Sequence, residues 1–113
     1  MKLSVEYEIG FADAEILEYR KESNELTVFV QAWNETVLRV SFFDVVGLMD
    51  LGVGDIADLV IENSGSAFLN NVIQQVYENI PSVHPYTLYQ FLNNDDNPAM
   101  EVVAAGIIVS RSE

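Results

Sequence analysis

A segment near the C-terminal end constrains the fold more than any other part of the sequence. Residues 99–109 form a β-type run that is apolar on both of its faces. Val103 and Ile107 point to one side, because side chains alternate along a strand. Val102 and Ile108 point to the other side. A strand of this kind belongs in the middle of a sheet whose two faces are both covered, so the chain must supply two covering layers or share one with another subunit.

The N-terminal part of the chain alternates with a period of two residues, which is typical of strands with one buried and one solvated face. Gly10, a polar turn at residues 21–24 and the pair Asn34-Glu35 separate its β-forming segments. The pattern predicts a four-stranded antiparallel meander. Its expected strands are residues 3–9, 14–21, 25–33 and 36–43.

The middle of the chain has a weaker pattern. Residues 44–54 contain three glycines and no clean period, so we expect a loop, with one helical turn as a possible feature. Residues 55–62 fit either a helix or a strand. The β-branched pair Val60-Ile61, followed by the turn-forming residues 63–66, favours a strand.

One helix and a hairpin complete the expected fold. Apolar residues recur at helical spacing over residues 67–79, with Ser66 as the expected N-cap. Residues 86–92 and 99–109 read as a C-terminal hairpin around a polar loop. We therefore expect a single α+β domain over residues 1–113, with an antiparallel sheet of about six strands. Because one helix covers only part of such a sheet, the remainder must curve or close on itself, or form a homodimer.

The charge of the chain excludes two classes of partner. The sequence has 5 Lys and Arg against 18 Asp and Glu, which gives a net charge of −13. Nucleic-acid binding and docking on an anionic membrane both require cations, so neither is expected. The N-terminal apolar residues are interrupted by Glu6 and Glu8, which does not fit a signal peptide, and we expect a cytoplasmic protein.

Catalytic and cofactor motifs are not evident in the sequence. The chain has no Cys, and its single His84 lies in a proline-flanked turn without a nucleophile motif. Gly47, Gly52 and Gly54 match neither a dinucleotide fingerprint nor a P-loop. We therefore expect a protein that is not an enzyme and that binds no cofactor.

The abundant carboxylates are potential ligands for a hard metal ion such as Ca²⁺. Residues 93–97 offer several oxygens, but adjacent side chains diverge in a hairpin loop and no Glu follows at the EF-hand distance. Asp50, Asp55 and Asp58 form a second, sparse group. The sequence predicts no metal site. A pair of carboxylates across a cleft would still permit a small enzyme or ligand binder, and nothing in the sequence selects such a pair.

The distribution of charge is the most informative functional feature. Residues 40–110 contain nine Asp and Glu but no Lys or Arg. One interpretation is an ordinary solvated acidic surface; the other is an anionic surface that steers a cationic partner. The expected partner-binding residues are Asp50, Asp55, Asp58, Glu62, Asp95 and Asp96.

Three short segments resemble a class of small bacterial proteins. They are Phe11–Ile16 (FADAEI), Trp33–Glu35 (WNE) and Ser41–Val45 (SFFDV). In these segments the chain resembles uncharacterised α+β families that include immunity proteins of bacterial toxin systems, over about the first 45 residues. The resemblance implies a non-enzymatic binder that neutralises a toxin by covering it, and it assigns no functional residues.

The leading hypothesis is therefore an acidic protein-binding module that engages a cationic partner. Two alternatives stay open. The first is a carboxylate-based enzyme or ligand binder, and the second is a structural homo-oligomer.

Overall fold

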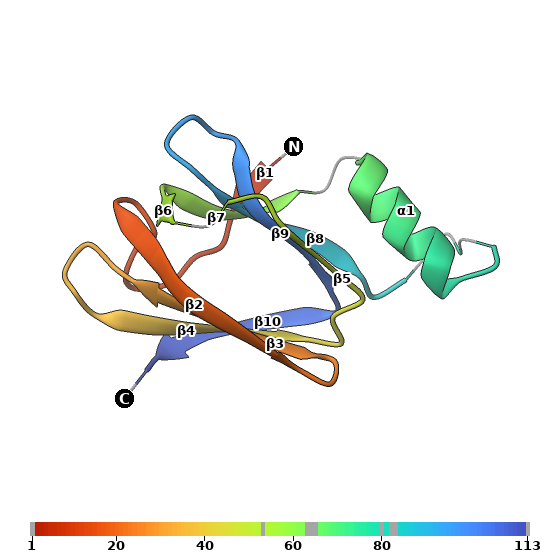
Figure 1. Ribbon diagram of the computed structural model, residues 1–113, viewed down its shortest axis with the longest axis horizontal. Coiled ribbons are helices and arrows are strands. Elements are labelled where there is room, and N and C mark those ends of the chain that lie inside the picture. The colour runs from red at the N-terminus through yellow and green to blue at the C-terminus, as the bar shows by residue number, and fades with distance from the viewer. Residues whose placement is uncertain (1, 53, 63–65, 80, 82–83, 113) are drawn as a thin grey trace.

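The computed structural model describes residues 2–52, 54–62, 66–79, 81 and 84–112. In this part of the chain, ten strands form two five-stranded antiparallel sheets, and one helix lies beside them (Figure 1). One sheet, called here the helix-covered sheet, has the order β1 (Lys2–Ser4), β7 (Asp58–Glu62), β8 (Thr87–Leu92), β9 (Pro98–Ala104) and β5 (Gly47–Asp50). The other, called the open sheet, has the order β10 (Gly106–Arg111), β4 (Val37–Phe43), β3 (Glu25–Gln31), β2 (Ala14–Glu22) and β6 (Asp55–Ile56).

Two bends in the backbone connect the sheets. β9 continues into β10 through Ala105, whose N–H donates to the Phe43 carbonyl at 2.9 Å. β6 continues into β7 through Ala57, whose N–H donates to the Leu92 carbonyl at 2.7 Å. The predicted strand over residues 99–109 is therefore divided between two sheets. Strand pairing continues through both corners, because the backbone groups at each bend still find partners.

The α+β class with an antiparallel sheet and one helix is confirmed, but the strand count and part of the topology were predicted wrongly. There are ten strands in two sheets, rather than about six. β2, β3 and β4 form the expected meander, whereas β1 pairs with β7 in the other sheet. Residues 44–54, expected as a loop, contain β5, and residues 55–62 are strand, as favoured. Long-range pairing decides these points, and local periodicity does not encode it.

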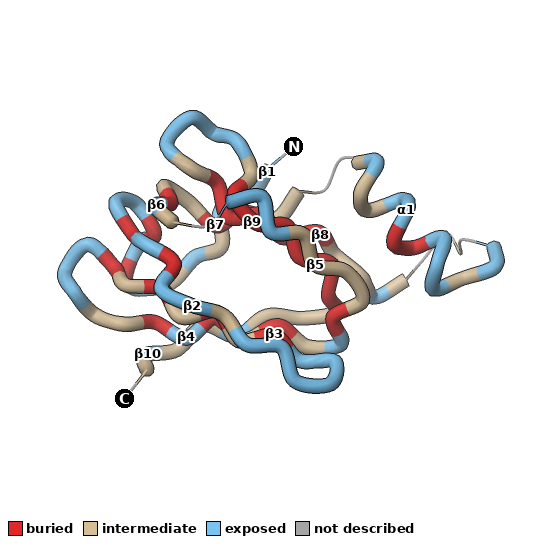
Figure 2. Tube along the Cα trace, viewed as in Figure 1, coloured by how far each residue is buried: buried red, intermediate tan, exposed pale blue. Residues whose placement is uncertain are grey.

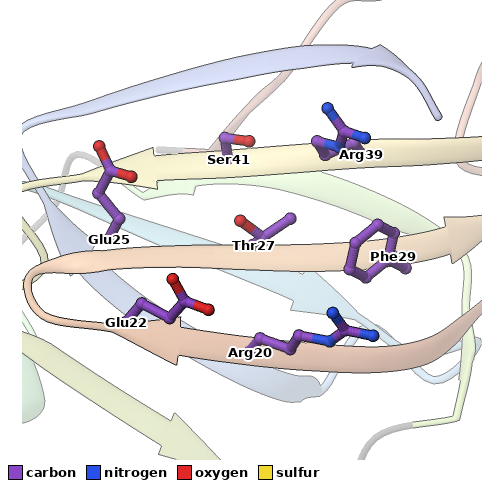
Figure 3. A pocket seen from close by; sticks show the side chains of 7 residues that line it. All are labelled: Arg20, Glu22, Glu25, Thr27, Phe29, Arg39 and Ser41. Carbon is purple, nitrogen blue, oxygen red and sulfur yellow. The ribbon is translucent and has the colours of Figure 1, made fainter. Parts of the chain in front are cut away.

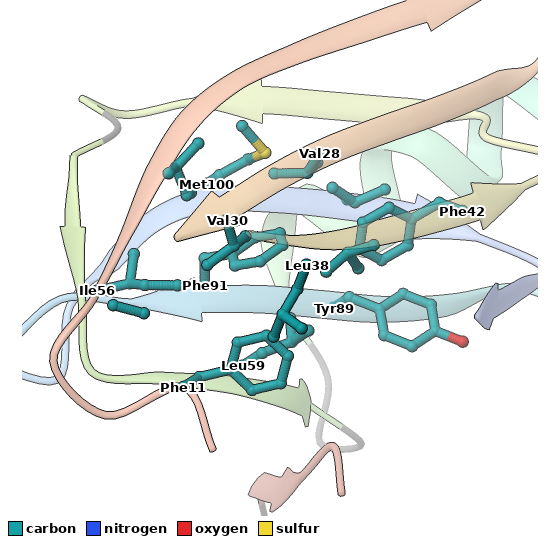
Figure 4. Packing of buried hydrophobic residues seen from close by; sticks show 14 of the residues in the cluster. Phe11, Val28, Val30, Leu38, Phe42, Ile56, Leu59, Tyr89, Phe91 and Met100 are labelled. Atoms are coloured by element: carbon teal, nitrogen blue, oxygen red, sulfur yellow. The ribbon is translucent and has the colours of Figure 1, made fainter. Parts of the chain in front are cut away.

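The main core lies between the two sheets. Phe42 of the open sheet packs against two aromatic rings of β8, with ring centroids 5.2 Å from Tyr89 and 6.1 Å from Phe91 (Figure 4). Val102 of β9 faces this core, whereas Val103 faces the helix. Both faces of β9 are thus covered within one chain, so its doubly apolar pattern does not by itself require the homodimer that the sequence suggested.

The helix α1 (Ala67–Val76) covers the outer face of β8 and β9. Its N-cap is Ser66, as predicted, and the Ser66 Oγ accepts a hydrogen bond from the Leu69 N–H at 3.0 Å. Val72 and Ile73 are its buried residues. No helix in the described part of the chain is long and apolar enough to cross a membrane.

The helix ends three residues before the predicted position, residue 79. Tyr77 adopts an extended backbone (φ −121°, ψ 138°), and its ring centroid lies 6.2 Å from that of Tyr86. This turn of the chain leaves Val76 40% exposed, although helical spacing placed it on the apolar face. The opposite half of the helix is exposed and carries the amide side chains of Asn70, Asn71, Gln74 and Gln75.

Candidate functional site

Four of the six predicted partner-binding carboxylates surround the β8–β9 hairpin loop. Asp58 pairs with Leu92 at the end of β8, and Asp50 pairs with Met100 near the start of β9. Residues 93–97 connect these two strands and carry Asp95 and Asp96. The other two predicted residues, Asp55 and Glu62, lie in different places from each other, and only Asp55 is near the β8–β9 loop.

Asp55 joins this end of the molecule, whereas Glu62 does not. Asp55 lines a small pocket of about 240 Å³ together with Asp13 and Asn94, which is a residue of the β8–β9 loop. Glu62 instead pairs with Leu88, at the opposite end of β7. We use the name acidic end for the carboxylates gathered here, at the left of Figure 1. The acidic end consists of Asp13, Asp50, Asp55, Asp58, Asp95 and Asp96.

Asp13 is a member of the acidic end that the sequence analysis missed. It lies in the loop before β2 and has a positive φ of 55°. Asp and Asn tolerate this left-handed conformation better than most residues. Nothing in the local sequence links position 13 to the distant Asp55, because the pairing of β2 with β6 brings the two together.

Two of these carboxylates also hold the fold in place. The Asp50 Oδ2 accepts a hydrogen bond of 2.8 Å from the Tyr19 hydroxyl, which connects β5 to β2 of the other sheet. This bond is the main cause that raises the pKa of Tyr19, with burial and the charge of Asp50 adding to it. The Asp58 Oδ2 accepts from the Ser4 hydroxyl at 2.8 Å. Asp55, Asp95 and Asp96 are exposed to solvent.

The β8–β9 loop uses its first side chain to fix its own backbone. The Asn93 Oδ1 accepts hydrogen bonds from the N–H groups of Asp95, at 2.9 Å, and Asn97, at 3.1 Å. Asp96 has a positive φ of 60°. This oxygen is therefore engaged within the loop. Among the residues described, no group of three or more His, Asp or Glu side chains is placed to hold a metal ion.

His84 has a structural environment. Its Nδ1 accepts a hydrogen bond of 3.2 Å from the Tyr86 N–H, and its ring is stacked on that of Tyr86 with centroids 6.1 Å apart. The Tyr77 ring lies 6.4 Å away. These contacts join the segment after α1 to the start of β8.

A second candidate site lies on the outer face of the open sheet. It is a shallow pocket of about 340 Å³ formed by neighbouring side chains of three strands (Figure 3). Its lining residues are Arg20 and Glu22 of β2, Glu25, Thr27 and Phe29 of β3, and Arg39 and Ser41 of β4. The sequence pattern placed Arg39 and Ser41 on one face of their strand. It gave no sign that this face would carry a pocket, because the pocket depends on the register between strands.

The comparisons with known proteins do not identify a family. No family model matches the chain, and neither the characterised proteins nor the solved structures that were compared contain a significant match.

Proposed function

We propose that this protein is a non-enzymatic binding module that engages a cationic protein through its acidic end. The observation that carries the proposal is the convergence of six carboxylates from four separate segments on one end of the molecule. These segments are the loop before β2, the end of β5, the β6–β7 corner and the β8–β9 loop. None of them contains a Lys or Arg.

The electrostatic argument follows from this placement. Charges of one sign on neighbouring segments add to a common potential, which raises the local concentration of an oppositely charged partner. At physiological salt the Debye length is about 8 Å, so a partner at this end is attracted mainly by the carboxylates nearest to it. A surface of this kind mainly accelerates association and excludes anionic competitors.

The chemistry of the partner follows from the charge. A protein with a lysine- or arginine-rich surface complements the acidic end, whereas nucleic acids and anionic lipids are repelled. A basic toxin is one such partner, in line with the resemblance of the N-terminal segments to immunity proteins. In this proposal the other end of the sandwich, with α1 and the β2–β3 turn, stays free.

The test uses two triple variants that each remove three negative charges. The first replaces Asp55, Asp95 and Asp96 by Asn, and these side chains are exposed. The control replaces Asp44 by Asn and Glu62 and Glu78 by Gln; these residues follow β4, end β7 and follow α1. Because Leu88, the partner of Glu62, lies five residues and roughly 17 Å before the β8–β9 loop, this set lies about two Debye lengths from Asp95 and Asp96 at physiological ionic strength.

Binding of a lysine-rich peptide to the immobilised protein is measured by surface plasmon resonance over a series of salt concentrations. We expect the acidic-end variant to slow association by about tenfold at physiological ionic strength, where screening separates the two sets, and the control by less than about twofold. The difference should vanish at high salt. Equal effects of the two variants would mean that only net charge matters, and the proposal would be rejected.

A further inference from the structure

The pocket on the outer face of the open sheet has a positive and a negative end. Arg20 and Arg39 lie with Phe29 at one end, whereas Glu22 and Glu25 lie at the other (Figure 3). The hydroxyl groups of Thr27 and Ser41 lie between them. The pocket is thus lined mainly by charged and polar groups, so a ligand that carries a negative group at one end and a positive group at the other would match its charges.

The positive end contains an arginine whose charge is not neutralised within the described part of the chain. No hydrogen bond or ion pair joins the Arg39 guanidinium to a described side chain, and its neighbours across the sheet are Phe29 and Ser110. Elsewhere the arginines are paired: Arg111 binds Glu8 at 2.9 Å.

Arg20 is positioned for the same end of the pocket. Its Nε and Nη2 contact Glu18 Oε1 at 2.9 Å and 2.8 Å, and its Cζ lies 5.7 Å from the centroid of the Phe29 ring. The ion pair and the aromatic ring hold the guanidinium over the sheet. Since a guanidinium has five N–H donors, Arg20 keeps donors for a further anion.

The negative end is a pair of like charges. Glu22 and Glu25 are directly opposite each other in the β2–β3 register. Cross-strand pairs of like charge destabilise a sheet, and no described cation forms an ion pair with either carboxylate. A cationic group placed between them would remove this repulsion. The fold therefore carries an unfavourable arrangement that a ligand can relieve.

We propose that this pocket binds a short peptide with free termini, whose carboxylate lies against Arg39 and Arg20 and whose ammonium lies against Glu22 and Glu25. The hydroxyls of Thr27 and Ser41 contact the peptide backbone between the two ends. Arginine forms charge-assisted hydrogen bonds with carboxylates, which gives the ligand its direction in the pocket.

The length of the pocket sets the length of the peptide. Arg39 and Phe43, which lies level with Glu25, are four residues apart on β4 and so roughly 13 Å apart along the strand. Arg20 and Glu22 are two residues apart, which corresponds to roughly 7 Å. An extended tripeptide spans roughly 10 Å, between these limits. The volume of about 340 Å³ lies at the small end of the usual range for ligand pockets.

The experiment follows backbone amide signals of the 15N-labelled protein during titration with triglycine. N-acetyl-triglycine, which lacks the ammonium, and triglycine amide, which lacks the carboxylate, are titrated separately. We expect saturable shifts at Thr27, Phe29 and Ser41 with triglycine, and an affinity about tenfold lower for each capped peptide. Absence of saturable shifts with triglycine, or capped peptides that bind as tightly as triglycine, would overturn the proposal.

Two variants test which end of the pocket binds which terminus of the peptide. Arg39→Gln should weaken triglycine and N-acetyl-triglycine but leave triglycine amide unchanged. Glu25→Gln should weaken triglycine and triglycine amide but leave N-acetyl-triglycine unchanged. The matched controls Arg111→Gln and Glu78→Gln should bind as the wild type does. Binding that survives in both Arg39→Gln and Glu25→Gln would place the peptide elsewhere and reject this pocket as its site.

We expect triglycine binding to be independent of the acidic end. The variant with Asn at positions 55, 95 and 96 should bind triglycine as the wild type does. If that variant loses triglycine binding while Arg39→Gln retains it, the peptide binds at the acidic end and the pocket proposal fails. The proposed function can fail separately, because its readout is the association rate of a lysine-rich peptide.

Discussion

The outer faces of the two sheets differ sharply, although a single apolar run, residues 99–109, supplies a strand to each. On the helix-covered sheet, Val103 of β9 is fully buried beneath α1, and even Gln90 of β8 and Glu101 of β9 are only 6% and 9% exposed. On the β10 part, Ile108 is 57% exposed, on the same side of the open sheet as the charged pocket. Figure 2 shows buried residues along β8 and β9, and exposed residues around the β2–β3 turn. Alternation thus identifies the residues that share a face, but the position of α1 decides which face is covered.

The largest expected change in the free energy of unfolding comes from an Asp introduced separately on each of the two outer faces. Val103→Asp buries a carboxylate without a partner beneath α1 and should lower the free energy of unfolding by about 4 kcal/mol. Ile108→Asp places the same group on the open face and should cost about 1 kcal/mol or less. Urea denaturation measures both values. Similar losses for the two variants would show that the outer face of β10 is covered as well.

The buried polar pair on the helix-covered sheet offers the next test. The Gln90 Nε2 donates to the Glu101 Oε2 at 3.0 Å, while the Gln90 Oε1 is buried and finds no hydrogen-bond partner among the described residues. Gln90→Leu or Glu101→Leu alone should destabilise the protein by about 2–3 kcal/mol, because each leaves its partner buried and unsatisfied.

The double variant Gln90→Leu/Glu101→Leu should be within about 1 kcal/mol of the wild type, or more stable, because both polar groups are removed together. A double-mutant cycle by chemical denaturation gives the coupling between the two sites. Additive losses would mean that the two side chains act independently, which the 3.0 Å hydrogen bond contradicts.

The close approach of α1 to β5 predicts a smaller effect. A Cβ on Gly47 would lie 2.7 Å from the Val72 Cγ2, so the helix packs where only glycine fits. Gly47→Ala should cost about 1–2 kcal/mol through overpacking. The same change on the open sheet, Gly106→Ala, meets its first neighbour, the Phe43 Cδ2, only at 3.9 Å and should be nearly neutral.

The variant Val72→Ala provides the control for this contact. In its background the added methyl group of Gly47→Ala has space, so the cost of Gly47→Ala should become smaller. Thermal melts of the two single variants and the double variant measure this. An unchanged cost would locate the strain in the backbone of β5 and not in its contact with α1.

Local sequence signals predicted the elements of this fold better than their arrangement. The helix, its Ser66 cap and the meander of β2 to β4 follow from periodicity and capping, which act between near neighbours. β5 was missed because it has only four residues and begins with a glycine, Gly47. The need for glycine there comes from close packing against α1, which begins some twenty residues later in the sequence. The same limit applies to the division of one apolar run into β9 and β10.

The candidate sites show the same limit. The stretch without Lys or Arg, residues 40–110, indicated Asp50, Asp55, Asp58, Asp95 and Asp96 as binding residues. Strand pairing brings these five residues to one end. Glu62 belongs to the same stretch but lies at the other end of its strand. Asp13 and the pocket around Arg39 lie outside the stretch, and only the register of the open sheet places them.

The smallest expected effect concerns the hydrogen bond that joins the two sheets. The Tyr19 hydroxyl donates to Asp50, which raises the pKa of Tyr19 above its usual value of about 10. A raised pKa in the folded protein means that the bond contributes stability below pH 10. This contribution is lost as the pH rises through the folded pKa. Because the Tyr19–Asp50 hydrogen bond is exposed to solvent, the contribution should be small.

Ultraviolet titration of the tyrosines tests this bond. Subtracting the Tyr19→Phe curve from that of the wild type isolates Tyr19 from Tyr89, whose pKa is also raised, mainly by burial. Asp50→Ala removes both the acceptor oxygens and the negative charge, so the Tyr19 transition should move back toward pH 10. The Tyr89 transition should not move, because burial raises the pKa of Tyr89. A Tyr19 transition that is the same with Asp and Ala at position 50 would show that the two sheets are not joined by this bond in solution, and that the strand bends at Ala57 and Ala105 and the shared core connect them without it.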